Sequence, residues 1–192
     1  TVLAALFERE RWQLPDEQAL AAIVYNGVLV LGFAQTAWFF LVRTLPPWSN
    51  NALSRLIKTP KLHFLDAGLQ SALMRLSPAM LTKHRDRCGS VLETWVYGEL
   101  RKNLALSDEC WVLGHYRDKD QVEVDFVLES PLREVIGLEV KAAATVAAAD
   151  FRGLRRLKEH TGKDFLTGIV FYDGDKSLPF GDGLWAVSLA AL

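Results

Sequence analysis

The stretch 121–143, QVEVDFVLESPLREVIGLEVKAA, decides the fold of this 192-residue chain. Two apolar, strand-like runs flank a short loop centred near Leu132, as in a β-hairpin. Antiparallel partners around that centre have residue numbers that sum to about 264. This register sets Asp125 opposite Glu139 and predicts that the two carboxylates share a face.

Two carboxylates at this separation repel each other in a half-buried sheet and need a cation between them. Lys141 follows Glu139 by two residues, so strand alternation puts it on the same side, while Leu138 and Val140 face the core. One lysine cannot satisfy several carboxylates. Two carboxylates with a backbone carbonyl form a hard-oxygen site of the kind that holds Mg²⁺ or Mn²⁺.

The residues around this hairpin have the periodicity of alternating helices and strands. A helix is predicted over 91–104, three strands over 110–116, 122–128 and 134–142, a second helix over 147–160, and two further strands over 165–172 and 184–189. Further upstream, 61–65 is predicted to be a short strand, and Asp66 to cap the helix that follows. The pattern is that of an α/β domain.

The first helix carries two acids near its apolar face. Glu93 lies beside Val96 and Leu100 on a helical wheel, and Glu99 lies beside Trp95. Helical geometry alone does not decide which of the two belongs to the acidic site.

The second helix carries a basic stripe formed by Arg152, Arg155 and Arg156, opposite its apolar residues. Such a stripe fits either the tracking of nucleic-acid phosphates or a solvated helix surface.

The segment 18–42 has no charged residue and is long enough to span a bilayer. Its Asn26, Gln35 and Thr36, together with two glycines, favour two buried elements of a soluble core instead. Both interpretations stay open, and the second predicts a protein without membrane attachment.

Composition sets few further limits. The formal net charge is −1 with 50% hydrophobic residues, so binding of nucleic acid would require a local basic surface. Cys88 and Cys110 are far apart among apolar neighbours, which predicts buried free thiols. We read no signal peptide, and expect a cytoplasmic location.

Five blocks of the sequence resemble a known family. They are RTLPPWSNNALSRLIKTPKLHFLDAGL, GSVLETWVYGELRK, YRDKDQVEVDFVLE, GLEVKAAATVAAADFRGLRRL and PFGDGLWAVSL. In this order they are similar to the domain of unknown function 4143, found behind AAA-type ATPase modules in prokaryotic proteins. The arrangement of Glu93, Asp125 and Glu139-Val140-Lys141 resembles the signature of the PD-(D/E)XK nuclease superfamily.

The resemblance implies a restriction-endonuclease-like core in 83–192, with a mixed sheet flanked by helices, behind a mainly helical region in 1–82. It favours Glu93 over Glu99. It implies that Asp125, Glu139, the carbonyl of Val140 and Glu93 hold Mg²⁺ or Mn²⁺, and that Lys141 assists hydrolysis of nucleic-acid phosphodiesters.

The chain also departs from the family pattern. It contains no GxxxxGK[ST] motif, so the ATPase module is absent from it. The block before Arg43 matches poorly the winged-helix-like segment of the relatives, and Val124 stands where the superfamily has proline. A non-catalytic module that binds nucleic acid or protein and regulates an ATPase is therefore the alternative function.

Overall fold

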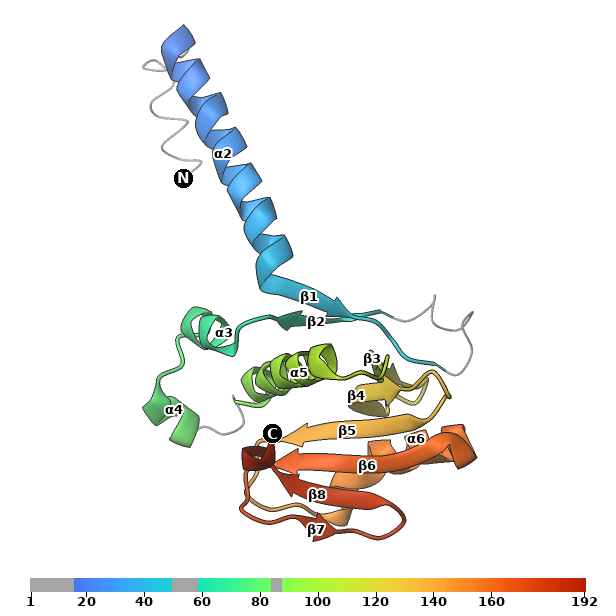
Figure 1. Ribbon diagram of the computed structural model, residues 1–192. Coiled ribbons are helices and arrows are strands. Elements are labelled where there is room, and N and C mark those ends of the chain that lie inside the picture. The colour runs from blue at the N-terminus through green and yellow to red at the C-terminus, as the bar shows by residue number, and fades with distance from the viewer. Residues whose placement is uncertain (1–15, 50–58, 84–87) are drawn as a thin grey trace. The chain divides into compact units, whose positions relative to one another are not determined.

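The computed structural model describes residues 16–49, 59–83 and 88–192. The chain divides into two compact units, 1–40 and 41–192, which are described separately. The larger unit contains a six-stranded sheet with helices on both faces (Figure 1). The predicted α/β class is confirmed.

The sheet has the strand order β3-β4-β5-β6-β8-β7 and is mixed. Its strands are β3 (Val112–Arg117), β4 (Glu123–Glu129), β5 (Val135–Lys141), β6 (Phe165–Tyr172), β7 (Leu178–Pro179) and β8 (Leu184–Ser188). The strands β3, β4 and β5 are antiparallel neighbours, whereas β5, β6 and β8 run parallel. The crossover from β5 to β6 requires a helix, and this is α6 (Arg152–Thr161).

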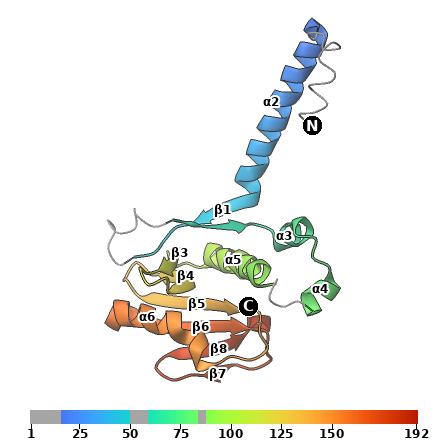
Figure 2. The same cartoon turned by 180° about the vertical axis from the view of Figure 1, so that it is seen from behind.

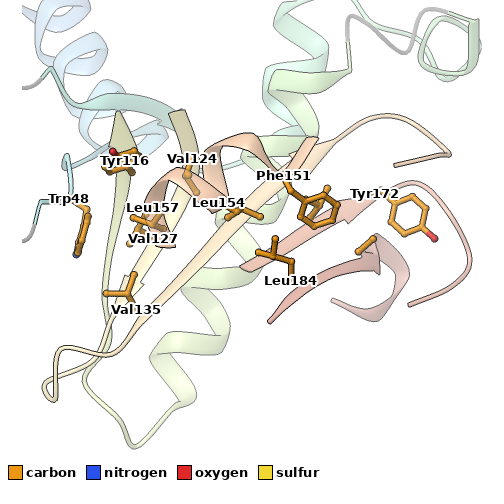
Figure 3. Packing of buried hydrophobic residues seen from close by; sticks show 12 residues of the cluster. Trp48, Tyr116, Val124, Val127, Val135, Phe151, Leu154, Leu157, Tyr172 and Leu184 are labelled. Atoms are coloured by element: carbon orange, nitrogen blue, oxygen red, sulfur yellow. The ribbon is translucent and has the colours of Figure 1, made fainter. Parts of the chain in front are cut away.

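One helix packs on each face of the sheet, and each encloses its own core. Helix α5 (Gly89–Leu106) buries Val96, Tyr97 and Leu100 against one face. Helix α6 covers the other face, which Figure 2 shows from behind, and buries Leu154 and Leu157, whose side chains are drawn in Figure 3. The apolar faces predicted for both helices are thus the faces that pack.

The hairpin of β4 and β5 has the predicted register, with Phe126 opposite Leu138 and Glu129 opposite Val135. The ladder between β3 and β4 is irregular. There two residues of β4, Asp125 and Phe126, lie opposite the single residue His115. Such a β-bulge changes the direction of a side chain and breaks strict alternation. Asp125 therefore does not follow the regular pleat that the prediction assumed.

Residues 41–83 belong to the same compact unit as the sheet. Their elements are β1 (Val42–Leu45), β2 (Lys61–Phe64), α3 (Ala67–Leu73) and α4 (Pro78–Lys83). The strands β1 and β2 pair with each other, and β2 packs on α5. Asp66 caps α3 as predicted, since its carboxylate accepts from the backbone N–H of Leu69 at 2.6 Å.

The predicted domain boundary between residues 82 and 83 thus differs from the division of the structure at 40 and 41. The reason is packing. Leu45 is buried in the core beneath α5, and Trp48 is buried in the core beneath α6. The backbone N–H of Trp48 also donates to the carbonyl of His115 in β3 at 2.6 Å.

Of the smaller unit the structure describes 16–40, where the residues from 17 on form one helix, α2 (Glu17–Leu41). The prediction of two buried elements is wrong, because neither glycine interrupts the helix and most of its described side chains are exposed. Asn26 and Thr36 bond carbonyls of their own helix at 2.9 and 2.7 Å. By length and composition alone, 17–34 is apolar enough to cross a membrane.

The thiols also differ from their prediction. Cys88 and Cys110 form no disulfide, but Cys88 is only half-buried and Cys110 is exposed. Of the apolar residues that follow Cys110, Trp111 and Leu113 pack against the core, whereas Val112 is exposed.

Candidate acid-lysine site

Asp125 is the centre of a cluster of charged side chains. Its Oδ1 accepts a hydrogen bond from Nζ of Lys61 at 2.9 Å, and its Oδ2 accepts one from the backbone N–H of Val140 at 3.0 Å. The bulge in β4 directs the carboxylate toward these partners. A strand residue directs its N–H and C=O to the same neighbour, so the carbonyl of Val140 also faces the side of Asp125.

Glu93 joins the cluster from α5. Its Oε1 lies 2.9 Å from Nζ of Lys61, so one ammonium bridges the carboxylates of Glu93 and Asp125. Burial, followed by the charge of Asp125, raises the pKa of Glu93, although Lys61 opposes both effects.

Glu99 takes no part in this cluster. Its carboxylate lies 2.5 Å from Nζ of Lys102, one turn along α5, and that ammonium is exposed. Helical geometry alone left open which of the two acids of α5 lies near Asp125. Glu93 contacts the lysine that Asp125 binds, whereas Glu99 binds a lysine of its own helix.

Glu139 and Lys141 form the second ion pair, with Nζ of Lys141 3.0 Å from Oε1 of Glu139. An added Cβ at Gly137 would lie 2.6 Å from Leu154 of α6. Alternation along β5 therefore puts Glu139 and Lys141 on the side of α6 and away from Leu138, as predicted.

The carboxyl group of Glu139 is strongly perturbed. Burial and then the charge of Asp125 raise its pKa to about 7, although Lys141 offsets part of the rise. Among the residues that the structure describes, its buried Oε2 has no hydrogen-bond partner. Asp125 thus acts electrostatically on both of the other acids, and the three acids and Lys141 form one coupled group.

Sequence reasoning missed two members of this group, Lys61 and His63. They are two residues apart on β2, so they face the same side. His63 stacks on Tyr97 of α5 with ring centroids 4.7 Å apart, and its Nε2 lies 3.8 Å from Oε1 of Glu93. Burial, and then the charge of Lys61, lower its pKa to about 4, so His63 is neutral near pH 7.

The arrangement differs from the predicted metal site in one respect. Asp125 and Glu139 do not face each other around a shared cation; each binds a lysine instead. Within the described ranges 16–49, 59–83 and 88–192, no group of three or more His, Cys, Asp or Glu side chains is positioned to hold a metal ion. The prediction required a cation between Asp125 and Glu139, whereas the ammonium of Lys61 bridges Asp125 and Glu93.

The predicted arginine stripe lies on α6, on the other face of the sheet from α5. Arg156 pairs with Asp118 at 3.1 Å and with Asp120 at 2.7 Å in the turn before β4. Arg155 donates to the carbonyl of Ala148 at 2.6 Å, and Arg152 is exposed. Arg156 therefore has a structural role in holding that turn, and among the described residues none of the three arginines forms an ion pair with Glu93, Asp125 or Glu139.

An apolar groove of about 490 Å³ lies between α3 and α5. Its lining includes Leu92 and Trp95 of α5, Gly68 of α3, and Ala142 at the end of β5. Among the described residues, none of the charged cluster lines this groove.

Comparison with protein families matches residues 88–192, more than half of the chain, to the family described as domain of unknown function DUF4143. The chain therefore belongs to this family. Residues 38–80 match a second family of unknown function, DUF8612. The acids and Lys141 fall in the first match, whereas Lys61 and His63 fall in the second.

Among curated proteins, the chain is similar to uncharacterized proteins of Mycobacterium bovis and Mycobacterium tuberculosis. Each is 26% identical over 147 residues, which is 77% of this chain and 31% of the relative. The chain thus spans about a third of the length of these relatives. No solved structure matches it.

Proposed function

We propose that this member of the DUF4143 family is a metal-dependent, PD-(D/E)XK-type hydrolase of nucleic-acid phosphodiesters. The observation that carries the proposal is that Lys61 lies 2.9 Å from both Glu93 and Asp125, while the backbone N–H of Val140, between Glu139 and Lys141, donates to Asp125 at 3.0 Å. Acids from a helix and two strands are therefore coupled in one cluster with Lys141, and this is the residue set of the nuclease signature. The order of helix, three strands, helix and further strands also supports a restriction-endonuclease-like core.

The donors fit Mg²⁺ or Mn²⁺ in kind. Carboxylate and carbonyl oxygens are the ligands that these ions prefer, and the buried, unpartnered Oε2 of Glu139 is an oxygen that an ion would satisfy. Asp125, Glu139, the carbonyl of Val140 and Glu93 would hold the ion. Their present arrangement includes the ammonium of Lys61, which lies between two of these ligands.

A bound divalent ion would supply a water of lowered pKa and positive charge at the phosphate. The protein's own contribution starts with Lys141, whose Nζ is held by Glu139 at 3.0 Å. In this position the ammonium of Lys141 would orient the attacking water. It would also stabilise negative charge on the phosphate, an effect of a few kcal/mol for one well-placed donor. Asp125 and Glu93 would position the ion.

We extend the proposal to partners. A nucleic acid would use the basic surface around Arg152 and Arg155, since Arg156 is committed to Asp118 and Asp120. About two-thirds of each relative's length lies outside the match, and the corresponding part of a longer protein would supply an AAA-type ATPase module in the cytoplasm.

Lys61 favours a second candidate function. The cluster contains three carboxylates and two ammonium groups, so its charge is nearly balanced without an ion. A site that is balanced in this way can serve as the rigid core of a non-catalytic module that binds nucleic acid or protein and regulates an ATPase.

Cleavage assays separate the two candidates. The full chain is incubated with single-stranded, duplex and branched DNA and with RNA, in Mg²⁺ or Mn²⁺, beside Asp125→Ala, Lys141→Ala and the control Lys102→Ala. We expect metal-dependent cleavage that both site variants lose and the control keeps. Cleavage that survives Asp125→Ala, or its absence on every substrate, would leave the binding module as the function.

A further inference from the structure

Lys61 occupies the position of a cation that the acids need. Its Nζ lies 2.9 Å from an oxygen of Glu93 and 2.9 Å from an oxygen of Asp125, and its side chain is only 23% exposed. The two carboxylates thus hold the ammonium by two charge-assisted hydrogen bonds in a partly buried position.

The strand that carries Lys61 is held firmly. β2 pairs with β1 over four residues, and the stacking of His63 on Tyr97 fixes it against α5. The four-carbon stem of a lysine, in contrast, rotates freely. The ammonium can therefore leave the two carboxylates by side-chain rotation, without any movement of β2.

A divalent ion and this ammonium exclude each other. Both would use Oε1 of Glu93 and Oδ1 of Asp125, and two cations a few ångströms apart in a half-buried site repel strongly. Binding of the ion at these oxygens therefore requires that Lys61 first gives up two charge-assisted hydrogen bonds.

We propose that Lys61 is a tethered cation that competes with the divalent ion for Glu93 and Asp125, and so sets the ion affinity of the site. This inference rests on the proposed function. Lys61 holds the carboxylates together in the ion-free protein and turns away when an ion binds. The segment 38–80, a family match of its own, would thus control the site built by 88–192.

The test measures Mn²⁺ binding directly, by the electron paramagnetic resonance signal of free Mn²⁺, with the full chain and no nucleic acid. Lys61→Met removes the competing charge, and Lys61→Gln removes it but keeps a hydrogen-bond donor. Lys102→Met is the matched control, since that lysine pairs with Glu99 on the same helix that carries Glu93. We expect both Lys61 variants to bind Mn²⁺ about tenfold more tightly than the wild type, a typical coupling between two sites. The control should bind as the wild type does.

Thermal unfolding gives a second readout. Without ion, the Lys61 variants should have a lower Tm than the wild type, because Glu93 and Asp125 then repel without compensation. Saturating Mn²⁺ should raise their Tm by more than it raises that of the wild type.

The outcomes separate this inference from the proposed function. If the wild type binds Mn²⁺ as tightly as the folded Lys61 variants, or more tightly, the inference is wrong and the metal site remains. Binding by the variants alone supports it. If neither the wild type nor any variant binds Mn²⁺, both the inference and the metal-dependent function fail. Lys61→Gln serves as the test where Lys61→Met does not fold.

Discussion

Nζ of Lys61 lies 2.9 Å from Oδ1 of Asp125, and this contact joins two segments that match separate families. The contact depends on the β-bulge opposite His115, which directs Asp125 out of the regular pleat. Lys61 then reaches Glu93 as well, so one side chain from β2 links a helix to the sheet. The strand β2, which precedes α5 in the chain, therefore contributes to the acidic site.

The two acids of α5 are expected to behave differently. Glu93→Gln should weaken Mn²⁺ binding by about tenfold or more, the usual cost of losing a group that supports a metal site, and should lower cleavage with it. Glu99→Gln should change neither quantity, since Glu99 pairs with Lys102 outside the cluster. Titration with Mn²⁺ and a cleavage assay on both variants check this. Equal losses in the two variants would contradict the assignment of Glu93.

Local patterns in the sequence predict most of the sheet. The span 165–172 matches β6, and the centre of the hairpin near Leu132 predicts the register of β4 and β5, because hairpin pairing depends only on the residues close to the turn. The apolar spacing of the two helices predicts their buried faces for a similar reason.

The position of Lys61 was not predictable in the same way. Its contact with Asp125 spans 64 residues of sequence, and it depends both on how β2 packs against α5 and on a bulge that leaves no local signal. The strand around Lys61 was predicted, but a short strand with no identified partner does not reveal which charged group it faces. The pattern of acids predicted a cation beside Asp125 but placed it opposite Glu139, whereas Lys61 lies between Asp125 and Glu93.

The domain boundary leads to a prediction about truncation. A chain that begins at Leu41 should unfold cooperatively with nearly the Tm of the full chain, because 41–192 is a compact unit. A chain that begins at residue 83 lacks Leu45 and Trp48, each of which contributes about 2–5 kcal/mol when buried in a core. We expect it to be largely unfolded.

Circular dichroism during heating checks both truncations. A fragment 83–192 that unfolds at the same temperature as 41–192 would show that β1 and β2 are not needed for folding, and the boundary predicted from sequence would then be the correct one.

The close approach of α6 to β4 predicts the effect of a small substitution. A Cβ added at Gly153 would lie 2.1 Å from the backbone carbonyl oxygen of Glu123, which cannot rotate away. Gly153→Ala should therefore lower the free energy of unfolding by about 1–3 kcal/mol or more. Gly98→Ala on α5 is the control, since its Cβ meets nothing within 4 Å and alanine favours a helix by about 1 kcal/mol. Urea denaturation of both variants measures the difference, and a stabilised Gly153→Ala would contradict the packing of α6.

The raised pKa of Glu139 makes stability depend on pH. Its pKa is about 7 in the folded protein against 4.5 for an ordinary glutamate, so between these values the folded protein binds more protons than the unfolded chain. Stability from this group is therefore present below about pH 4.5 and is lost as pH rises toward 7. The loss is on the order of 3 kcal/mol.

Glu139→Gln removes this titration and keeps the size of the side chain. The free energy of unfolding is measured by urea denaturation from pH 4.5 to 8, without divalent ions, for the wild type and the variant. The difference between them is the informative quantity, because His63, with its pKa lowered to about 4, makes both proteins gain stability as pH rises through the lower part of this range. We expect the wild type to lose stability relative to Glu139→Gln as pH rises to 7, and to change no further above pH 8. A constant difference across the range would mean that Glu139 is ionised throughout, and that Lys141 outweighs its burial.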